Sequence, residues 1–574
     1  MRHKFVLIVG ILLPGLTGCV GHPPIAPQPG DVLHLAVQVA RGEATLGNIE
    51  RAYRDLGITT AVSPDVMAIA QALDREGNSN GCLDGTGLIT GLKAYATGQP
   101  INGQTVDGRV LIGLARIYAT GARISPSTLV QSGRTYYVAP WGDNANPGTR
   151  DQPWATPGYG SRQLTPGDTL VILGGRYVLS EYDADIITPP SGTADAWITI
   201  KGEEGNRPVL AGRNNLLTAI DLSGAQYVRI ENLEITHDAT VRGEAAWFRD
   251  GLEILGEPVA HIVLKDLYIH HVDEFGMNIQ DVEDLQILHC RIEYAGFGAL
   301  GGPAGEHGGW RNVVIRGCVL SYSGHYYQGG DGSDRPYDRP DGFGIEPSQG
   351  PVLIEDTIVE HNYGDGIDSK AANTTIRRTI VANNSSDGVK LWGDHSRVEN
   401  TLIYGRGDGN PEPSPWAAIV IDQVETPGAS FEIVNVTVDD LVGQNYLMYV
   451  QYEGQPVRLT VRNTIFSGRG PRCPIYVGGE STLVADHNLF YLPQSETVLI
   501  HGDRAYTAAS IGDLGPVNFY GDPLFVRPAW GEEGNYHLQE GSPAIDAGSP
   551  EDAPADDLEG RPRDDRPDIG AYEY

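Results

Sequence analysis

A short repeat of strand-like segments restricts the fold of this chain more than any other feature. Similar segments recur at intervals of roughly 22 to 35 residues: YVRIENLEI, IVLKDLYI, LQILHCRI, VVIRGCVL, VLIEDTIV, TTIRRTIV, SRVENTLI, FEIVNVTV and VRLTVRNTIF. Self-similarity at this period is typical of solenoids, in which each coil buries its apolar side against the next. Ile354, Ile376 and Val398 are 22 residues apart, which predicts one inward-facing ladder. We therefore expect an all-β fold, a right-handed parallel β-helix.

The pattern divides the chain into regions of different character. Residues 31–130 space their apolar residues three and four apart, which predicts a small helical domain. The strand repeat predicts that the β-helix covers residues 134–510, and the Asp- and Pro-rich remainder, 511–574, is expected to close its end. Leucine-rich repeats and propellers are disfavoured because their repeat signatures are absent from the sequence.

The first residues have the layout of an export signal. Arg2 and Lys4 precede a short apolar run that ends in Leu16-Thr17-Gly18-Cys19, and this run is too short to span a membrane as a helix. Residues 1–19 resemble a lipoprotein signal peptide, with Cys19 as the lipidated residue, and 20–30 read as a Pro-rich linker. We expect an exported protein at the bacterial cell surface or outer envelope, held to the membrane only through that lipid. An ordinary secretory signal is the alternative.

Charge and cysteine spacing exclude several functions. A formal net charge of -33 argues against nucleic acid as a partner, and an acidic polysaccharide would be repelled unless a cation intervened. Cys82, Cys290, Cys318 and Cys473 show no metal-ligand spacing. Cys290 and Cys318 occupy the same point of two consecutive repeats and are expected to be stacked and buried, with a disulfide left open. We expect a monomer.

One column of the repeat concentrates ionisable residues. Its members are Gly251-Leu252-Glu253, Gly276-Met277-Asn278, Gly344-Ile345-Glu346, Gly366-Ile367-Asp368 and Gly388-Val389-Lys390. Equivalent residues of stacked coils lie about 4.8 Å apart, so Glu346, Asp368 and Lys390 are predicted to be vertical neighbours. Asp365 and Asp387 precede the glycines of their coils, and Asp341 lies one turn earlier.

Carboxylates stacked at this spacing repel one another, so a positive charge must lie among them. Several oxygen ligands without a His or Cys cluster favour calcium over zinc. Lys390 supplies positive charge as well, and a structural salt-bridged seam with no catalytic role remains the alternative reading.

Two segments resemble the family 9 pectate lyases. GDGIDSK (364–370) is similar to their calcium-binding Asp-Asp-Gly-aromatic-Asp stretch, and SDGVKLWG (386–393) is similar to the Asn-Gly-Phe-Lys-Leu-Gly-Gly stretch that carries their catalytic lysine. The resemblance implies that Asp341, Asp365 and Asp368 bind calcium and that Lys390 is the base. Asp387, which lies beside them, is expected to be a further ligand. Gly364 stands where the family has the first of two aspartates.

The resemblance and the column together predict a calcium-dependent lyase that cleaves a uronate-containing, pectate-like polymer by β-elimination. Glu346, Trp392 and Arg406 are predicted to contact the substrate, and Lys370 is a second candidate for the base. Two alternatives stay open: a non-catalytic, surface-anchored glycan-binding or structural β-helix, and a glycoside hydrolase with paired carboxylates.

Overall fold

A computed structural model describes residues 133–241, 246–328, 340–407, 417–442, 445–451, 454–470 and 474–574. The chain divides into two units between Ser132 and Gly133, and all described residues belong to the second unit. The predicted signal peptide, linker and helical domain, together with Cys19, Cys82 and Cys473, therefore lie outside the described residues. No described helix has the length and apolar character needed to cross a membrane.

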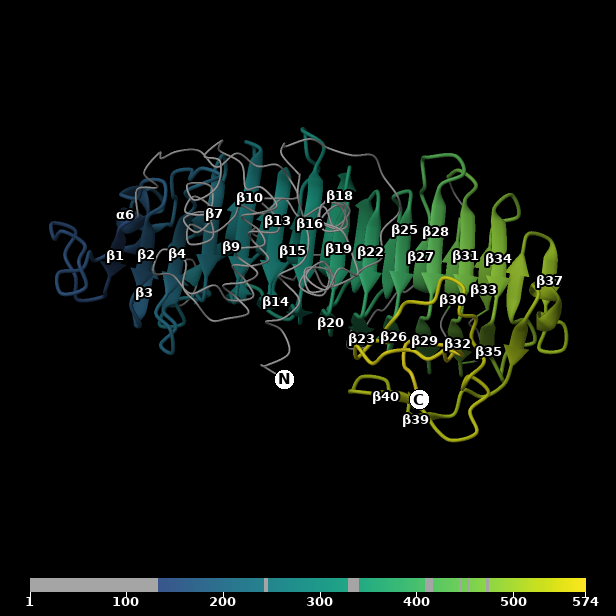
Figure 1. Cartoon of the computed structure of the whole chain (residues 1–574). Helices are drawn as coiled ribbons and strands as arrows, with labels where there is room; N and C mark the ends of the chain where they lie inside the picture. The colour runs from purple at the N-terminus through teal and green to yellow at the C-terminus, as the bar shows by residue number, and fades with distance from the viewer. Residues whose placement is uncertain are drawn as a thin grey trace, which may run out of the picture. The chain divides into compact units, whose positions relative to one another are not determined.

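The second unit is a parallel β-helix. Over the described ranges, its strands form three long sheets of 13, 13 and 12 strands, and from β4 to β36 each coil contributes one strand to each sheet in turn. Pairing between successive coils is parallel in all three sheets, except for an antiparallel pair at one end of the third. Figure 1 shows the coils following one another from β1 to β37.

The first sheet contains β1 (Thr135–Val138), β2 (Thr169–Ile172), β4 (Ile198–Gly202), β7 (Gln226–Glu231), β10 (Val259–Lys265), β13 (Val282–Leu288), β16 (Trp310–Arg316), β19 (Val352–Glu355), β22 (Thr374–Arg377), β25 (Ser396–Glu399), β28 (Ser430–Val434), β31 (Arg458–Arg462) and β34 (Thr482–Asp486).

The second sheet contains β3 (Arg176–Leu179), β5 (Val209–Gly212), β8 (Glu234–His237), β11 (Tyr268–Val272), β14 (Arg291–Ala295), β17 (Val319–Ser321), β20 (Ile358–Glu360), β23 (Ile380–Ala382), β26 (Leu402–Tyr404), β29 (Thr437–Asp440), β32 (Ile465–Gly468), β35 (Asn488–Tyr491) and β38 (Asn518–Tyr520).

The third sheet contains β6 (Leu216–Asp221), β9 (Phe248–Ile254), β12 (Phe275–Ile279), β15 (Gly298–Gly302), β18 (Asp341–Ser348), β21 (Ile367–Ala371), β24 (Val389–Leu391), β27 (Ala417–Ile421), β30 (Tyr446–Val450), β33 (Ile475–Val477), β36 (Leu499–His501) and β37 (Arg504–Tyr506). The remaining elements are α6 (Pro157–Arg162), α7 (Tyr182–Asp185), the 3-10 helix at Ile511–Leu514, and the antiparallel pair β39 (Phe525–Arg527) and β40 (Asn535–Leu538).

Each repeat segment of the sequence contributes two strands, joined at a corner that contains one residue in the left-handed backbone region. This residue turns the chain from the first sheet into the second, and Asn, Asp, His and Gly tolerate its positive φ better than other residues do. Such residues include Asn232, Asp266, His289, Gly317, Asp356, Asn400, Asn435, Asn463 and His487. The polar residue or glycine inside each apolar repeat segment therefore forms the corner between two strands.

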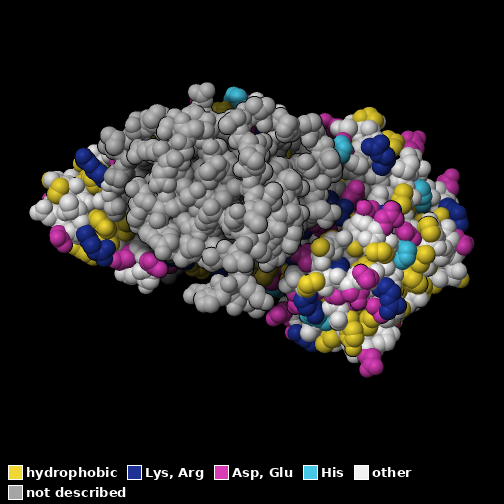
Figure 2. Space-filling model, viewed as in Figure 1, with side chains coloured by type: hydrophobic (Ala, Val, Ile, Leu, Met, Phe, Trp, Pro, Cys, Tyr) yellow, Lys and Arg dark blue, Asp and Glu magenta, His cyan; other side chains and the backbone are white. Residues whose placement is uncertain are grey.

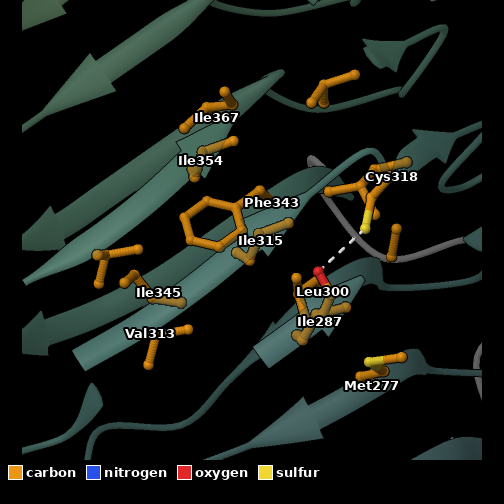
Figure 3. Close-up of a cluster of buried hydrophobic side chains, with 14 of the residues drawn as sticks. Met277, Ile287, Leu300, Val313, Ile315, Cys318, Phe343, Ile345, Ile354 and Ile367 are labelled. Carbon is orange, nitrogen blue, oxygen red and sulfur yellow. Dashed lines mark hydrogen bonds between the residues drawn. The ribbon is translucent and has the colours of Figure 1, made fainter. Parts of the chain in front are cut away.

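The interior is filled by apolar ladders. Ile354 pairs with Ile376 and Ile376 with Val398, as the 22-residue spacing predicts, and all three are buried. Figure 3 shows this packing around Phe343, Ile354 and Ile367. Cys290 and Cys318 are buried free thiols, and the Cys318 Sγ donates to the Ile287 carbonyl oxygen over 3.5 Å.

The C-terminal segment packs against the outside of the second sheet. β38 still pairs in parallel with β35, so the last stacked strand lies beyond the predicted boundary at residue 510. Residues after β38 run beside β23, β26, β29 and β32 (Figure 1) and share an apolar cluster with Leu402, Tyr404 and Ile465. In Figure 2 acidic and basic side chains are interspersed over this end of the β-helix.

Candidate active site

The candidate site lies on the outward side of the third sheet, at β18, β21 and β24. Ile367 and Val389 point into the core and are completely buried, so the alternate residues Asp368 and Lys390 point outward. Buried Asn384 accepts hydrogen bonds from the Asn362 backbone and side-chain amides, at 3.1 and 2.9 Å. These two asparagines fix the corners that lead into β21 and β24.

Glycines in the same frame let successive coils approach closely. A Cβ on Gly366 would lie 2.7 Å from the Gly388 carbonyl oxygen, and one on Gly388 would lie 2.4 Å from the Ala418 oxygen. Real Cβ atoms do not come this close to backbone oxygens. The Asp-Gly-aliphatic frame therefore sets the spacing of the coils as well as the place of the carboxylates.

Asp341, Asp365 and Asp387 form one column that is tied to the backbone. Asp341 Oδ1 accepts from the Asp365 N–H at 2.7 Å, Asp365 Oδ1 from the Asp387 N–H at 2.9 Å, and Asp387 Oδ1 from the Ala417 N–H at 2.9 Å. Each carboxylate is thus oriented by the coil that follows it.

Lys390 lies among carboxylate Oδ2 atoms. Its Nζ is 2.5 Å from Asp365 Oδ2 and 3.7 Å from the Oδ2 atoms of Asp368 and Asp387. Burial lowers the pKa of Lys390, but the attraction of the three carboxylates is stronger and raises it overall. Lys390 is therefore protonated at neutral pH in this arrangement.

Asp341, Asp365 and Asp368 offer one carboxylate oxygen each within 4.8 Å of one another. Asp368 Oδ1 is buried and has no hydrogen-bond partner. Burial raises the pKa of Asp368 to about 6, with Lys390 opposing and Asp365 reinforcing the shift. Burial, Asp365 and Asp368 likewise raise the pKa of Asp341. Positive charge compensates Asp341 and Asp368 only incompletely, whereas Asp365 contacts Lys390 directly. Asp387 is outside this group.

A second set of outward residues borders the cluster one step further along the strands. Lys370 Nζ donates to Glu346 Oε1 at 2.6 Å and lies 5.0 Å from the centre of the Trp392 ring. Trp392 is half-buried, and its Nε1 has no hydrogen-bond partner. Glu346 and Trp392, both predicted to contact substrate, are therefore joined through Lys370.

Residues 136–401 match the family model described as Pel9A-like, right handed beta helix region. The matched range contains the cluster from Asp341 to Lys390. This β-helix is right-handed and resembles the family 9 pectate lyases. A search of curated proteins found no match.

Three solved structures resemble the β-helix of this chain. Pectate lyase Pel9A is 17% identical, with 77% of this chain and 96% of that chain covered and a TM-score of 0.44. The A-module of mannuronan C-5 epimerase AlgE4 from Azotobacter vinelandii is 12% identical, with 59% and 91% covered and a TM-score of 0.45. The GH136 lacto-N-biosidase from Eubacterium ramulus is 14% identical, with 82% and 93% covered and a TM-score of 0.42.

The stacking of the coils corrects the predicted position of Glu346. Phe343 pairs with Ile367 and Gly344 with Asp368, and the register shifts between Ile345 and Ser348. Gly344, not Glu346, is therefore the vertical neighbour of Asp368. A slip of two residues keeps every side chain on its own face, so the apolar pattern does not distinguish the two registers. The same correction places Asp341 in one column with Asp365.

Arg406 does not lie at the site. Its Nη2 is 2.6 Å from Asp440 Oδ2, and the two side chains are 2% and 1% exposed. Trp530 Nε1 donates to the Arg406 carbonyl oxygen. A guanidinium buried and paired in this way cannot bind a substrate carboxylate, so this prediction does not hold. The spacing of residues in the sequence did not predict this ion pair, because Asp440 comes from another coil.

A related set of residues lies in the same sheet, on the earlier strands β9 and β12, and was not predicted as a site. Asp250 Oδ1 accepts from the Phe275 N–H at 2.8 Å, as Asp365 does from Asp387, and Asp250 Oδ2 accepts from Asn278 Nδ2 at 2.9 Å. Glu253 occupies the place that corresponds to Asp368 and accepts from the Tyr182 hydroxyl at 3.2 Å. The sequence carries the signal, because Asp250-Gly251-Leu252-Glu253 repeats the frame of 365–368.

Burial raises the pKa of Asp250 to about 8 and that of Glu253 to about 7. Neutral Asn278 is paired with Glu253 in this cluster, at the place where Lys390 is paired with Asp368 in the cluster described above. The two clusters therefore use the same backbone frame with a charged partner, Lys390, in one and a neutral partner, Asn278, in the other.

Proposed function

We propose that this protein is a calcium-dependent polysaccharide lyase that cleaves a uronate-containing polymer by β-elimination. The observation that carries the proposal is the contact of Lys390 Nζ with Asp365, at 2.5 Å, beside the three clustered carboxylates. The Lys390 side chain lies on the outward side of the sheet and is 15% exposed, and the surrounding carboxylates control its charge.

The residues present fit a calcium ion. Asp341, Asp365 and Asp368 are hard oxygen ligands, and the buried Asp368 Oδ1 lacks any partner, as expected of an atom whose partner is an ion. Bound calcium would compensate the carboxylates that hold the Lys390 proton and would polarise a uronate carboxylate. We assign Asp341, Asp365 and Asp368 as the ligands, with Asp387 as a partner of Lys390.

Lys390 is the base in this proposal. Its neutral Nζ takes the proton from C5 of the uronate, the electron pair forms the C4–C5 double bond, and the C4–O bond to the leaving sugar breaks. The leaving oxygen takes a proton from water, and the hydroxide that remains takes the proton back from the Lys390 ammonium. Elimination needs a base fixed on the face of C5, and the contacts of Lys390 with Asp365 and Asp387 support this role because they restrain its side chain.

Lys370 has a different role in this proposal. Its Nζ is already engaged by Glu346 Oε1 at 2.6 Å and faces the Trp392 ring. We assign Glu346, Lys370 and Trp392 to substrate contact, with Lys370 offering a fixed positive charge for a second uronate carboxylate.

The proposal is tested by the ultraviolet absorbance of unsaturated product from polygalacturonate and alginate, with calcium and with a chelator. We expect calcium-dependent product from the wild type, loss of at least about a thousandfold in Lys390→Ala, and a smaller loss in Lys370→Ala. Asp368→Asn should raise the calcium concentration needed for half-maximal rate. Equal activity of Lys390→Ala and wild type would refute the assignment of the base.

One observation favours a second candidate function. The Lys390–Asp365 ion pair is complete without a metal, and it keeps the lysine protonated. In a glycan-binding β-helix without catalysis, this ion pair would have only a structural role. Polymer binding without unsaturated product, in the presence of calcium, would identify that function.

A further inference from the structure

We propose that Tyr446, Tyr449 and Tyr476 form a distal saccharide-binding platform for the polymer whose uronate is cleaved at Lys390. The platform rests on the proposed function for its choice of ligand. It lies on the outward side of β30 and β33, in the coils that follow the candidate site.

The register connects the platform to the site. Lys390 pairs with Val420, Val420 with Tyr449, and Tyr449 with Tyr476. At about 4.8 Å a rung, the two tyrosines are roughly 10 and 14 Å from Lys390 along the helix axis. Tyr446 belongs to the neighbouring column, because it pairs with Ala417, whose amide donates to Asp387. The three rings therefore continue the two columns that build the site.

The rings form one continuous surface. The centres of Tyr449 and Tyr476 are 5.4 Å apart with their planes at 22°, and Tyr446 lies 5.0 Å from Tyr449 and 5.9 Å from Tyr476. All three side chains are half-buried. An aromatic ring fixed by its neighbours presents an apolar face with polar hydroxyls at the edge, and this combination suits the alternating C–H and O–H groups of a pyranose.

Charge favours this end of the sheet for an acidic polymer. In the same outward column, the coils before the site carry Asp221 and Glu253, whereas those after Lys390 carry Val420, Tyr449, Tyr476 and Ile500. An anionic chain that extends from Lys390 towards the tyrosines meets the neutral side chains of this column, whereas in the other direction it meets Asp368 next to Lys390 and Asp221 beyond it. Aromatic contacts add affinity there without adding charge.

The test is retardation in native gels that contain polygalacturonate or alginate, for the full chain and the variants Tyr449→Ala, Tyr476→Ala and Tyr449→Phe. We expect the two alanine variants to bind about tenfold more weakly than wild type, while Tyr449→Phe, which keeps the ring, binds as wild type does. Tyr491→Ala is the matched control, because Tyr491 is also half-buried and packs on Tyr520, but lies in the second sheet. Thermal melting confirms that the variants are folded.

Unchanged retardation of Tyr449→Ala and Tyr476→Ala would overturn the platform, as would a wild type retarded by neither polymer. The product assay is separate. Lys390-dependent product with unchanged polymer binding of the tyrosine variants would remove the platform and leave the lyase. Ring-dependent binding without unsaturated product would remove the lyase and leave the platform.

Discussion

At the scale of single residues, the two carboxylate clusters hold an aspartate in the same backbone frame but give it different partners. Asp365 and Asp250 each accept a backbone N–H through Oδ1. Asp365 Oδ2 meets the Lys390 ammonium at 2.5 Å, whereas Asp250 Oδ2 meets the neutral amide of Asn278 at 2.9 Å. Desolvation without a compensating charge keeps Asp250 protonated.

Asp250 should therefore make stability depend on pH. Its pKa rises from 3.8 to about 8 on folding because the carboxyl is buried. Between these values the folded protein binds one more proton than the unfolded chain, so this group's contribution to stability falls as pH rises, by at most about 1.4 kcal/mol per pH unit. Asp250→Asn removes this contribution.

Urea unfolding of wild type and Asp250→Asn between pH 5 and pH 8 measures the difference, and the variant is expected to have the shallower dependence. Parallel pH profiles for the two proteins would show that Asp250 is ionised throughout this range.

At the scale of elements, the core ladders could be predicted from the sequence, and the register at β18 could not. The spacing of Ile354 and Ile376 admits one alignment because their segments have the same length. In DGFGIE, Gly342-Phe343-Gly344 and Gly344-Ile345-Glu346 both fit the glycine frame, and both put an apolar residue inward. The choice depends on contacts with neighbouring coils, such as Asp341 with the Asp365 amide.

Ile376→Ala tests the ladder. Ile376 is completely buried between Ile354 and Val398, so its truncation should lower the free energy of unfolding by about 2–5 kcal/mol. The neighbouring Thr375 points outward and pairs with Arg397, and Thr375→Ala should change the stability by less than about 1 kcal/mol. Denaturant unfolding measures both. A comparable loss in the two variants would contradict the assignment of inward and outward faces.

At the scale of the whole second unit, the C-terminal segment is bound to coils far from it in sequence. The side-chain amides of Asn400, Asn435 and Asn463 donate to the carbonyl oxygens of Asp556, Asp568 and Ser549. These asparagines also make the corner between the first two sheets. The sequence indicates a closing segment but not where it docks, because the docking surface is assembled from several coils.

Tyr536 is the central contact of that segment. Its ring packs on Tyr404, and its hydroxyl donates to Asp439 Oδ2 at 3.0 Å. Tyr536→Ala should destabilise the docked segment by about 3–5 kcal/mol, so limited proteolysis should cut within residues 521–574 earlier than in wild type. Tyr536→Phe keeps the ring and should cost about 1–3 kcal/mol. Identical proteolysis of wild type and Tyr536→Ala would mean that the segment is held by other contacts.

The central claim is that bond cleavage at Lys390 is an elimination. Mass spectrometry of polygalacturonate fragments formed in calcium and heavy-oxygen water tests it most directly, because elimination adds no water oxygen whereas hydrolysis adds one at each cut. The account predicts unlabelled, unsaturated fragments from the wild type and none from Lys390→Ala. Fragments that carry the heavy oxygen, or unsaturated fragments formed equally by Lys390→Ala, would contradict it.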